Sequence, residues 1–274
     1  MKKNENIFAA WNKIEHTHSF DFWNKVSKSC MKFMFSSYEE NKYLIDCLKK
    51  NKNQSVLDYG CASGYVKRFL NFYFDSKLKY TGIDISTKSI ELAKKNYGNE
   101  FFTVPEYENS GIKSKKFDIV YSRDTIMHQE EPWKFITTLI SKTNNFLILK
   151  LRTRDNGPTD LNVENSCQMQ PGELWAPYII LNYDELLEFL KKNNFKFIKT
   201  NRSYSMLAGN NLRYLDKSLY YKKTGTAFTS VIASFENNTS ENKLIEQFNL
   251  EGDNFFKEKK FLTIFYKILN KMRI

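Results

Sequence analysis

The chain has 274 residues, of which 41% are hydrophobic and 16% aromatic, so it is long and apolar enough to bury the core of one large α/β domain. It contains no apolar run near the roughly 20 residues of a membrane span, no signal-peptide pattern and no Cys-x-x-Cys pair, so we expect a cytoplasmic protein with reduced thiols. The net charge of +11 favours anionic partners, such as nucleic acid, an acidic membrane face or a phosphorylated small molecule, although the lysines are spread along the chain.

Residues 1–51 carry large apolar side chains at a nearly helical spacing, among them Trp11 and Phe35. This pattern predicts a helical cap that packs on the edge of the core. His16 and His18 lie two residues apart, but no other metal-ligating side chain is near them in the sequence. We therefore expect no metal site.

From residue 55 onward, strand-like segments alternate with segments of helical pattern. We predict strands at 55–59, 79–84, 100–104, 117–122, 145–151, 195–200 and 227–234. We predict helices at 64–74, 87–97, 131–141 and 183–193, with Ser86 and Asn182 placed to cap the second and the fourth. This alternation predicts an α/β fold with a doubly wound, seven-stranded, mostly parallel sheet and helices on both faces.

Two segments fall outside this alternation. Residues 152–180 form a long connection, and connections of this length are usually functional or disordered; their Pro, Trp and Tyr residues argue against disorder. Residues 255–274 have the pattern of a basic amphipathic helix, which we expect to pack on its own domain or on a second subunit, with membrane-surface contact as the alternative. We predict a single domain, with a core at about 52–235, an N-terminal cap at 1–51 and a C-terminal tail at 236–274.

The segment from Val56 to Gly64 ends an apolar run with Asp58 and opens into a loop that contains Gly60. Glycine is needed where the backbone turns tightly and comes close to a ligand, because a side chain would block the approach. A helical segment follows, and the next predicted strand delivers Asp84 about 20 residues after the loop, where nucleotide-type folds place an acid on a ribose. This order of elements predicts a ligand with a ribose.

The spacing of the loop also indicates which ligand it suits. A dinucleotide fold seats a pyrophosphate on G-x-G-x-x-G, whereas this chain has G-x-x-x-G with Asp58 two residues before the first glycine. A carboxylate at that position would repel a pyrophosphate and attract an ammonium group. S-adenosylmethionine has a ribose, an adenine, an amino-acid end and no phosphate, so it fits this loop.

These residues resemble the class I S-adenosylmethionine-dependent methyltransferases. The glycine loop is similar to the first motif of that family, Gly82-Ile-Asp-Ile-Ser86 to the second, and Phe117-Asp-Ile-Val-Tyr-Ser122 to the fourth strand, whose end faces the methyl group. The resemblance covers about residues 52–235. It implies an antiparallel last strand, S-adenosylmethionine as cofactor with S-adenosylhomocysteine as product, and a lid role for the N-terminal cap.

The chain departs from the family pattern at Ala62, where many members have glycine. We expect alanine to be tolerated there only at a negative φ. Ligands of open α/β sheets bind beyond the carboxyl ends of the strands, and a carboxylate there can accept bonds from both ribose hydroxyls. The predicted cofactor-binding residues at these ends are Asp58, Gly60, Cys61, Ala62, Gly64, Asp84, Ile85, Ser86, Pro105, Glu106, Ser122 and Arg123.

Asp124 and His128 lie four residues apart, just after the predicted fourth strand. If this segment is helical, both side chains lie on one face, and the carboxylate can orient the imidazole. The histidine would then take the proton of a hydroxyl acceptor as a general base. We predict this pair as catalytic; the alternative is a structural histidine that bonds a backbone carbonyl.

Arg152 and Arg154 lie just past the predicted fifth strand, and alternate residues at a strand end point the same way. Two guanidinium groups suit a phosphate or a carboxylate, and Trp175 and Tyr178 would form an aromatic wall for a sugar or a base. We predict these four as substrate-binding. The alternative is a surface ion pair with Asp155 beside a hydrophobic plug.

The sequence thus predicts a methyltransferase that acts on an oxygen, or less favourably a nitrogen, of a small anionic metabolite, such as a nucleotide-linked or phosphorylated sugar of surface polysaccharide synthesis. An RNA methyltransferase would suit the basic charge. However, the fourth strand lacks the Asn/Asp-Pro-Pro-Tyr/Phe motif used on base amines, and no RNA-binding domain is appended. A protein that binds S-adenosylmethionine without turnover is the third hypothesis, and a homodimer is compatible with all three.

Overall fold

The computed structural model describes residues 11, 26–74, 78–170, 174–204, 213–220, 225–236 and 243–249. His16, His18 and the predicted helix at 255–274 lie outside these residues. The helices are α3 (Lys28–Ser36), α4 (Glu39–Lys50), α5 (Tyr65–Leu70), α6 (Thr87–Tyr97), α7 (Val104–Glu108), α8 (Pro132–Ser141) and α9 (Tyr183–Lys192), with 3-10 turns η2 (Ile126–His128) and η3 (Lys217–Tyr220).

The strands form one large sheet and one small sheet. They are β1 (Val56–Tyr59), β2 (Tyr80–Asp84), β3 (Phe101–Thr103), β4 (Phe117–Arg123), β5 (Thr143–Arg154), β6 (Cys167–Gln170), β7 (Leu174–Pro177), β8 (Leu181–Asn182), β9 (Phe197–Tyr204), β10 (Arg213–Tyr214), β11 (Thr226–Ser234) and β12 (Lys243–Asn249).

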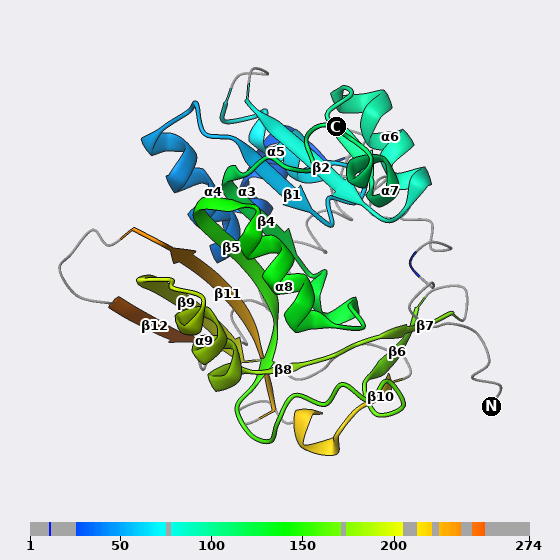
Figure 1. Ribbon diagram of the computed structural model, residues 1–274, viewed down its shortest axis with the longest axis vertical. Helices are drawn as coiled ribbons and strands as arrows, with labels where there is room; N and C mark the ends of the chain where they lie inside the picture. The colour runs from blue at the N-terminus through cyan, green and yellow to red at the C-terminus, as the bar shows by residue number, and fades with distance from the viewer. Residues whose placement is uncertain are drawn as a thin grey trace.

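The large sheet has the order β12-β9-β11-β5-β4-β1-β2-β3, with β8 paired to β5 (Figure 1). Strands β1 to β5 run parallel to one another, and β11 runs antiparallel to both β5 and β9. The seven predicted strands and the antiparallel last strand are thus confirmed. The prediction missed β8 and β12, because β8 has two residues and β12 reads Lys-Leu-Ile-Glu-Gln-Phe-Asn, a mixed polar pattern.

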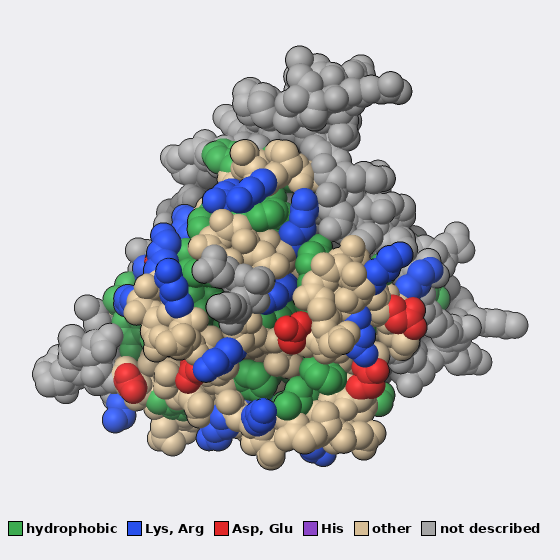
Figure 2. Space-filling model, turned by 90° about the horizontal axis from the view of Figure 1, so that it is seen from above, with side chains coloured by type: hydrophobic (Ala, Val, Ile, Leu, Met, Phe, Trp, Pro, Cys, Tyr) green, Lys and Arg blue, Asp and Glu red, His purple; other side chains and the backbone are tan. Residues whose placement is uncertain are grey.

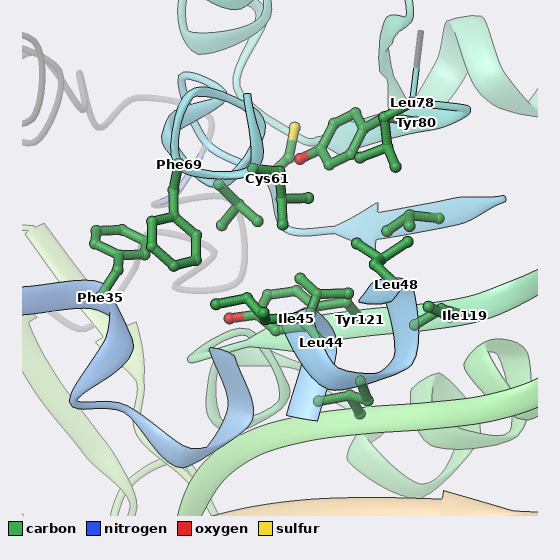
Figure 3. Close-up of a cluster of buried hydrophobic side chains, with 14 of the residues drawn as sticks. Phe35, Leu44, Ile45, Leu48, Cys61, Phe69, Leu78, Tyr80, Ile119 and Tyr121 are labelled. Atoms are coloured by element: carbon green, nitrogen blue, oxygen red, sulfur yellow. The ribbon is translucent and has the colours of Figure 1, made fainter. Parts of the chain in front are cut away.

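Two apolar layers bury the faces of the large sheet. On one face, α3, α4 and α5 pack on the sheet, with Phe35 and Phe69 in ring contact at 4.8 Å and Leu44 and Leu48 close to Tyr121 (Figure 3). On the other face, α8 and α9 cover the strands. The predicted N-terminal cap is therefore helical over α3 and α4, and it belongs to the core of the domain.

Local sequence signals start the helices as predicted. Ser86 Oγ accepts a hydrogen bond from the Ser89 N–H at 3.3 Å, and Asn182 Oδ1 accepts one from the Glu185 N–H at 3.0 Å. Both bonds satisfy N–H groups that a helix leaves unpaired in its first turn.

The described residues of the long connection after β5 contribute two strands to a small sheet. Strands β6, β7 and β10 pair in the order β10-β6-β7, and all pairs are antiparallel. The Ile179 N–H donates to the Met127 carbonyl at 2.8 Å, so the segment after β7 is bonded to η2. This bond holds the connection against the carboxyl end of β4.

No helix in the described ranges has both the length and the apolar character needed to cross a membrane. In the same ranges, no three or more His, Cys, Asp or Glu side chains are grouped as a metal ion would require.

Candidate active site

The glycine loop between β1 and α5 holds three residues in the left-handed region. Gly60, Ala62 and Gly64 have φ values of +88°, +47° and +81°. A Cβ on Gly60 would lie 2.0 Å from Thr125 Oγ1, so the loop packs directly against the segment after β4. The expected negative φ at Ala62 is therefore wrong. Alanine takes a conformation that costs about 1–2 kcal/mol for a residue with a Cβ.

Asp84, the last residue of β2, bridges the glycine loop and the start of α6. Its Oδ2 accepts from the Ala62 N–H at 2.9 Å, and its Oδ1 accepts from the Ser86 N–H at 2.9 Å. The first bond ties the amide of Ala62, in the middle of the glycine loop, to the end of β2. Each carboxylate oxygen has a second acceptor site for a ribose hydroxyl. The adjacent Ile85 is 43% exposed and offers apolar surface for a purine.

Asp58 lies beneath the loop and is only 1% exposed. Its carboxyl accepts a hydrogen bond from the Tyr80 hydroxyl. Burial raises the pKa of Asp58 to about 7, although the bond from Tyr80 opposes the shift. The carboxyl thus supports the loop from inside, and its contact with the ammonium group of a ligand stays a prediction.

Several other predicted cofactor residues have side chains that build the loops. Ser122 Oγ donates to the Tyr59 carbonyl at 2.9 Å. Glu106 accepts from the Thr103 N–H at 2.7 Å and from Lys94 Nζ at 3.0 Å, in a capping box that starts α7. The thiol of Cys61 is buried. Pro105 lies in the first turn of α7, directly after β3.

Arg123, another predicted cofactor residue, ties the N-terminal cap to the end of β4. Its Nε lies 3.0 Å from Glu40 Oε1, and its guanidinium lies 4.4 Å from the centre of the Tyr38 ring. Glu40 is 1% exposed and also accepts from Ser230 Oγ at 2.8 Å. The pair of Arg123 and Glu40 therefore joins α4, β4 and β11. No local pattern predicts this buried pair, because its members lie far apart along the chain.

Asp124 and His128 do not form the predicted helical pair. Asp124 has a φ of +54°, and η2 begins only at Ile126, so the two side chains do not share a helix face. Lys150 Nζ donates to both oxygens of Asp124, at 2.6 and 2.5 Å. His128 Nδ1 lies 2.7 Å from the Pro177 carbonyl oxygen, which can only accept, so this nitrogen carries the proton. A backbone carbonyl therefore orients the ring.

The predicted aromatic wall divides into two parts. Tyr178 is 9% exposed, and its ring centre lies 6.0 Å from that of His128. Trp11 lies on the same histidine at 4.4 Å. Trp175 instead stacks on Tyr214 at 5.1 Å within the small sheet. The structure therefore brings Tyr178 to the histidine and keeps Trp175 in a separate contact.

The two predicted arginines have different surroundings. Arg154 donates from Nε to the Asn156 carbonyl at 2.6 Å and pairs with Asp216 at 3.1 Å, so it holds the loop after β5. Arg152 is 4% exposed, donates to Thr226 Oγ1 at 2.6 Å and lies 3.7 Å from the centre of the Phe228 ring. The ion pair proposed with Asp155 is not formed by either arginine; that acid pairs with Arg202.

A cavity of about 280 Å³ lies at the end of β4. Its walls come from the α3–α4 junction and from β4, β5, β9 and β11, and they include Tyr38, Glu40, Arg123, Asp124, Lys150 and Phe228. The sequence analysis missed Lys150, although it alternates with Arg152 and Arg154 along β5 and the same period of two would have found it. It also missed Glu40 and Phe228, for which no local pattern exists.

Comparison with known proteins agrees with this geometry. A family model described as a methyltransferase domain matches residues 50–196, which is 147 of the 274 residues. The chain is 26% identical over 185 residues to protein 235L of Invertebrate iridescent virus 6, covering 66% of this chain and 62% of that one. It is 30% identical over 155 residues to a phosphoethanolamine N-methyltransferase of Triticum aestivum, covering 49% of this chain and 30% of the relative.

The chain thus spans less than two thirds of the length of these curated relatives. Among solved structures, the CurJ carbon methyltransferase has a TM-score of 0.50 at 12% identity, covering 81% of this chain and 59% of that one, which is a likeness of fold. The family model runs from the end of α4 to the start of β9 and includes the glycine loop, Asp84 and the end of β4. The chain therefore belongs to the class I S-adenosylmethionine-dependent methyltransferases.

Proposed function

We propose that this protein transfers a methyl group from S-adenosylmethionine to an oxygen of a small anionic molecule. Arg152 carries the proposal. Its guanidinium is buried, its Nε has no hydrogen-bond partner, and no carboxylate of the described residues forms an ion pair with it. A buried charge without a counter-charge is costly, so an anionic ligand beside Arg152 would offset that cost.

The residues at the glycine loop fit the cofactor. Gly60 and Gly64 leave room for close approach, Asp84 has acceptor sites for two ribose hydroxyls, and Ile85 offers a surface for adenine. When bound, S-adenosylmethionine supplies an electrophilic methyl group on a sulfonium. The protein has to hold the acceptor atom in line with that methyl group, and positioning of this kind contributes a large part of the rate.

His128 is the proposed general base. A hydroxyl acceptor must lose its proton as the methyl group arrives, and an imidazole in its neutral form can take that proton. Asp124 has no orienting role in this scheme, because the Pro177 carbonyl holds Nδ1. Tyr178 lies beside both His128 and Arg152, so the base and the anion-binding group are close to one another.

The acceptor class is proposed as a phosphorylated or nucleotide-linked sugar, such as one used in surface polysaccharide synthesis. A nitrogen acceptor is the second candidate, because several matched relatives are named phosphoethanolamine N-methyltransferases, including two of Arabidopsis thaliana at 32% identity over about 100 residues. On the face drawn in Figure 2, Lys and Arg side chains are interspersed with other types and do not merge into one basic patch, so this face gives no support to an RNA substrate.

The test begins with release of S-adenosylhomocysteine from a panel of phosphorylated sugars, nucleotide sugars, phosphorylated amines and tRNA. With the best acceptor, Arg152→Met should raise KM at least about tenfold, the loss expected for a charge-assisted contact, and leave cofactor affinity nearly unchanged. Arg154→Met is the matched control, since that arginine holds a loop and should leave KM within about threefold. Equal KM effects in both variants, or turnover on tRNA alone, would refute the proposal.

A further inference from the structure

The acid at the end of β4 is paired with a lysine of the same chain. Asp124 lines the cavity, and its side chain is 39% exposed. Both of its oxygens accept from Lys150 Nζ, and Arg123 Nε lies 3.6 Å from Oδ2. Burial tends to raise the pKa of Asp124, but the Lys150 ammonium and the Arg123 guanidinium outweigh it and lower that pKa. The carboxylate is thus charged and neutralised by cations of its own chain.

Lys150 lines the same cavity as Asp124. It stands on β5, its side chain is 9% exposed, and its ammonium lies 4.9 Å from the centre of the Phe228 ring. Two of its three N–H bonds point at Asp124, and among the described residues Asp124 is the hydrogen-bond partner that the structure gives it. The third N–H can therefore donate to a ligand in the cavity.

We infer that Lys150 determines the acceptor class by occupying Asp124, so that the cavity takes a hydroxyl or anionic group and disfavours an ammonium group. The inference rests on the proposed function, because it takes this cavity as the acceptor site. A hydroxyl or phosphate oxygen can accept the remaining N–H of Lys150, whereas an ammonium ion has no lone pair to accept it. An ammonium ion would also meet a like charge, and the carboxylates of the cavity wall are already paired with cations. Asp124 pairs with Lys150, Glu40 with Arg123 and Glu39 with Lys42.

Lys150 is therefore a specificity-determining residue, and its removal has a definite consequence. Without the ammonium, Asp124 becomes an uncovered anion at the end of β4 with Arg123 at its side. Its partial exposure allows water to solvate it, so the variant need not leave a buried, unpaired charge. The same cavity should then attract an amine.

The test uses two probes of the same size, 2-hydroxyethyl phosphate and 2-aminoethyl phosphate, which share a phosphate and differ in one end group. Dissociation constants are measured by calorimetry on the full chain saturated with S-adenosylhomocysteine. The wild type should bind the hydroxyl probe at least about tenfold more tightly. Lys150→Met should reverse this order and bind the amine probe with a dissociation constant below about 1 mM.

Two controls separate the role of Lys150 from a general effect of charge. Lys150→Arg keeps a cation beside Asp124 and should keep the wild-type preference. Lys199→Met removes a lysine on β9 that lies 5.3 Å from the Tyr43 ring and outside the cavity, so it should also keep that preference. Thermal unfolding checks that each variant is folded, and Lys150→Gln replaces Lys150→Met if the latter is not.

The inference is overturned if the wild type shows no preference between the probes, or if the folded Lys150 variant gains no affinity for the amine. The test measures binding, so its result does not depend on whether the protein transfers a methyl group. A protein that shows the expected preferences but transfers no methyl group to any anionic acceptor would disprove the proposed function and leave the inference intact.

Discussion

The two halves of the ligand-binding edge of the sheet are built in different ways. At β1 and β2 the site is made of backbone, where the loop from Gly60 to Gly64 meets a single carboxylate, and Ala62 and Asp84 are 22 residues apart. At β4, β5 and β11 it is made of side chains that lie far apart in the sequence. Ser230 and Glu40, which bond across this half, are separated by 190 residues.

This difference indicates which half of the site can change its ligand specificity through single substitutions. A backbone site depends on φ angles and close packing, so most substitutions there disturb the loop itself. A site of paired side chains can alter its charge pattern through one residue while the strands stay in place. Each prediction below changes a residue in one half, either the backbone site at β1 and β2 or the side-chain site at β4, β5 and β11. If a substitution in one half altered the function of the other, the two halves would not be independent.

The largest effect is expected at His128, in the side-chain half. His128→Ala should lower kcat about 10²–10⁴-fold on a hydroxyl acceptor, the usual range for a positioned general base, with S-adenosylhomocysteine affinity unchanged. His128→Asn separates the two roles, because its amide can still donate to the Pro177 carbonyl but cannot act as a base. Steady-state kinetics in which His128→Asn retains more than about a third of kcat would make the histidine structural.

The next effect concerns Asp58, beneath the backbone half. Its folded-state pKa of about 7 lies above the unfolded value, so the folded state holds an extra proton between about pH 4 and 7. This contribution to stability is present at low pH and is lost as pH rises through that window, by up to roughly 1.4 kcal/mol per pH unit. Urea unfolding of the cofactor-free protein gives the free energy of unfolding at each pH. From pH 5 to pH 8, this free energy should rise for Asp58→Asn relative to the wild type. A constant difference would contradict the buried-acid assignment.

A smaller effect is expected at Asp84. Asp84→Ala removes the proposed acceptor for two ribose hydroxyls and should weaken S-adenosylhomocysteine binding at least about tenfold by calorimetry. Asp118→Ala is the matched control, because that acid also accepts two bonds, from Ser55 N and Oγ at 2.8 Å each, but lies at the start of β4. Equal losses in both variants would mean that Asp84 acts through stability alone.

The smallest effect is expected at Ala62. Ala62→Gly relieves the positive φ and should stabilise the protein by about 1 kcal/mol, or roughly 2–4 °C in Tm. Ala93→Gly, in the interior of α6, should destabilise it by a similar amount, because glycine is unfavourable in a helix. A loss of stability in Ala62→Gly would show that the loop conformation does not strain the alanine.

The sequence predicted the central sheet because its signals are local. Apolar runs, glycines and caps such as Ser86 act within a few residues, and the seven predicted strands follow from them. The same reasoning failed at Asp124 and His128. A spacing of four residues indicates a shared face only inside a helix, and the positive φ of Asp124 prevents a helix from starting there.

By itself, the sequence determined the fold class, the glycine loop and the place of Asp84 at the end of β2, since each depends on residues close together in the chain. Only the tertiary structure decided the charge pattern of the cavity at the end of β4. Lys150 meets Asp124 because β4 and β5 are neighbours in the sheet, and Glu40 meets Arg123 because α4 packs on their face. Such pairings arise from how strands and helices pack, and no spacing along the chain encodes them.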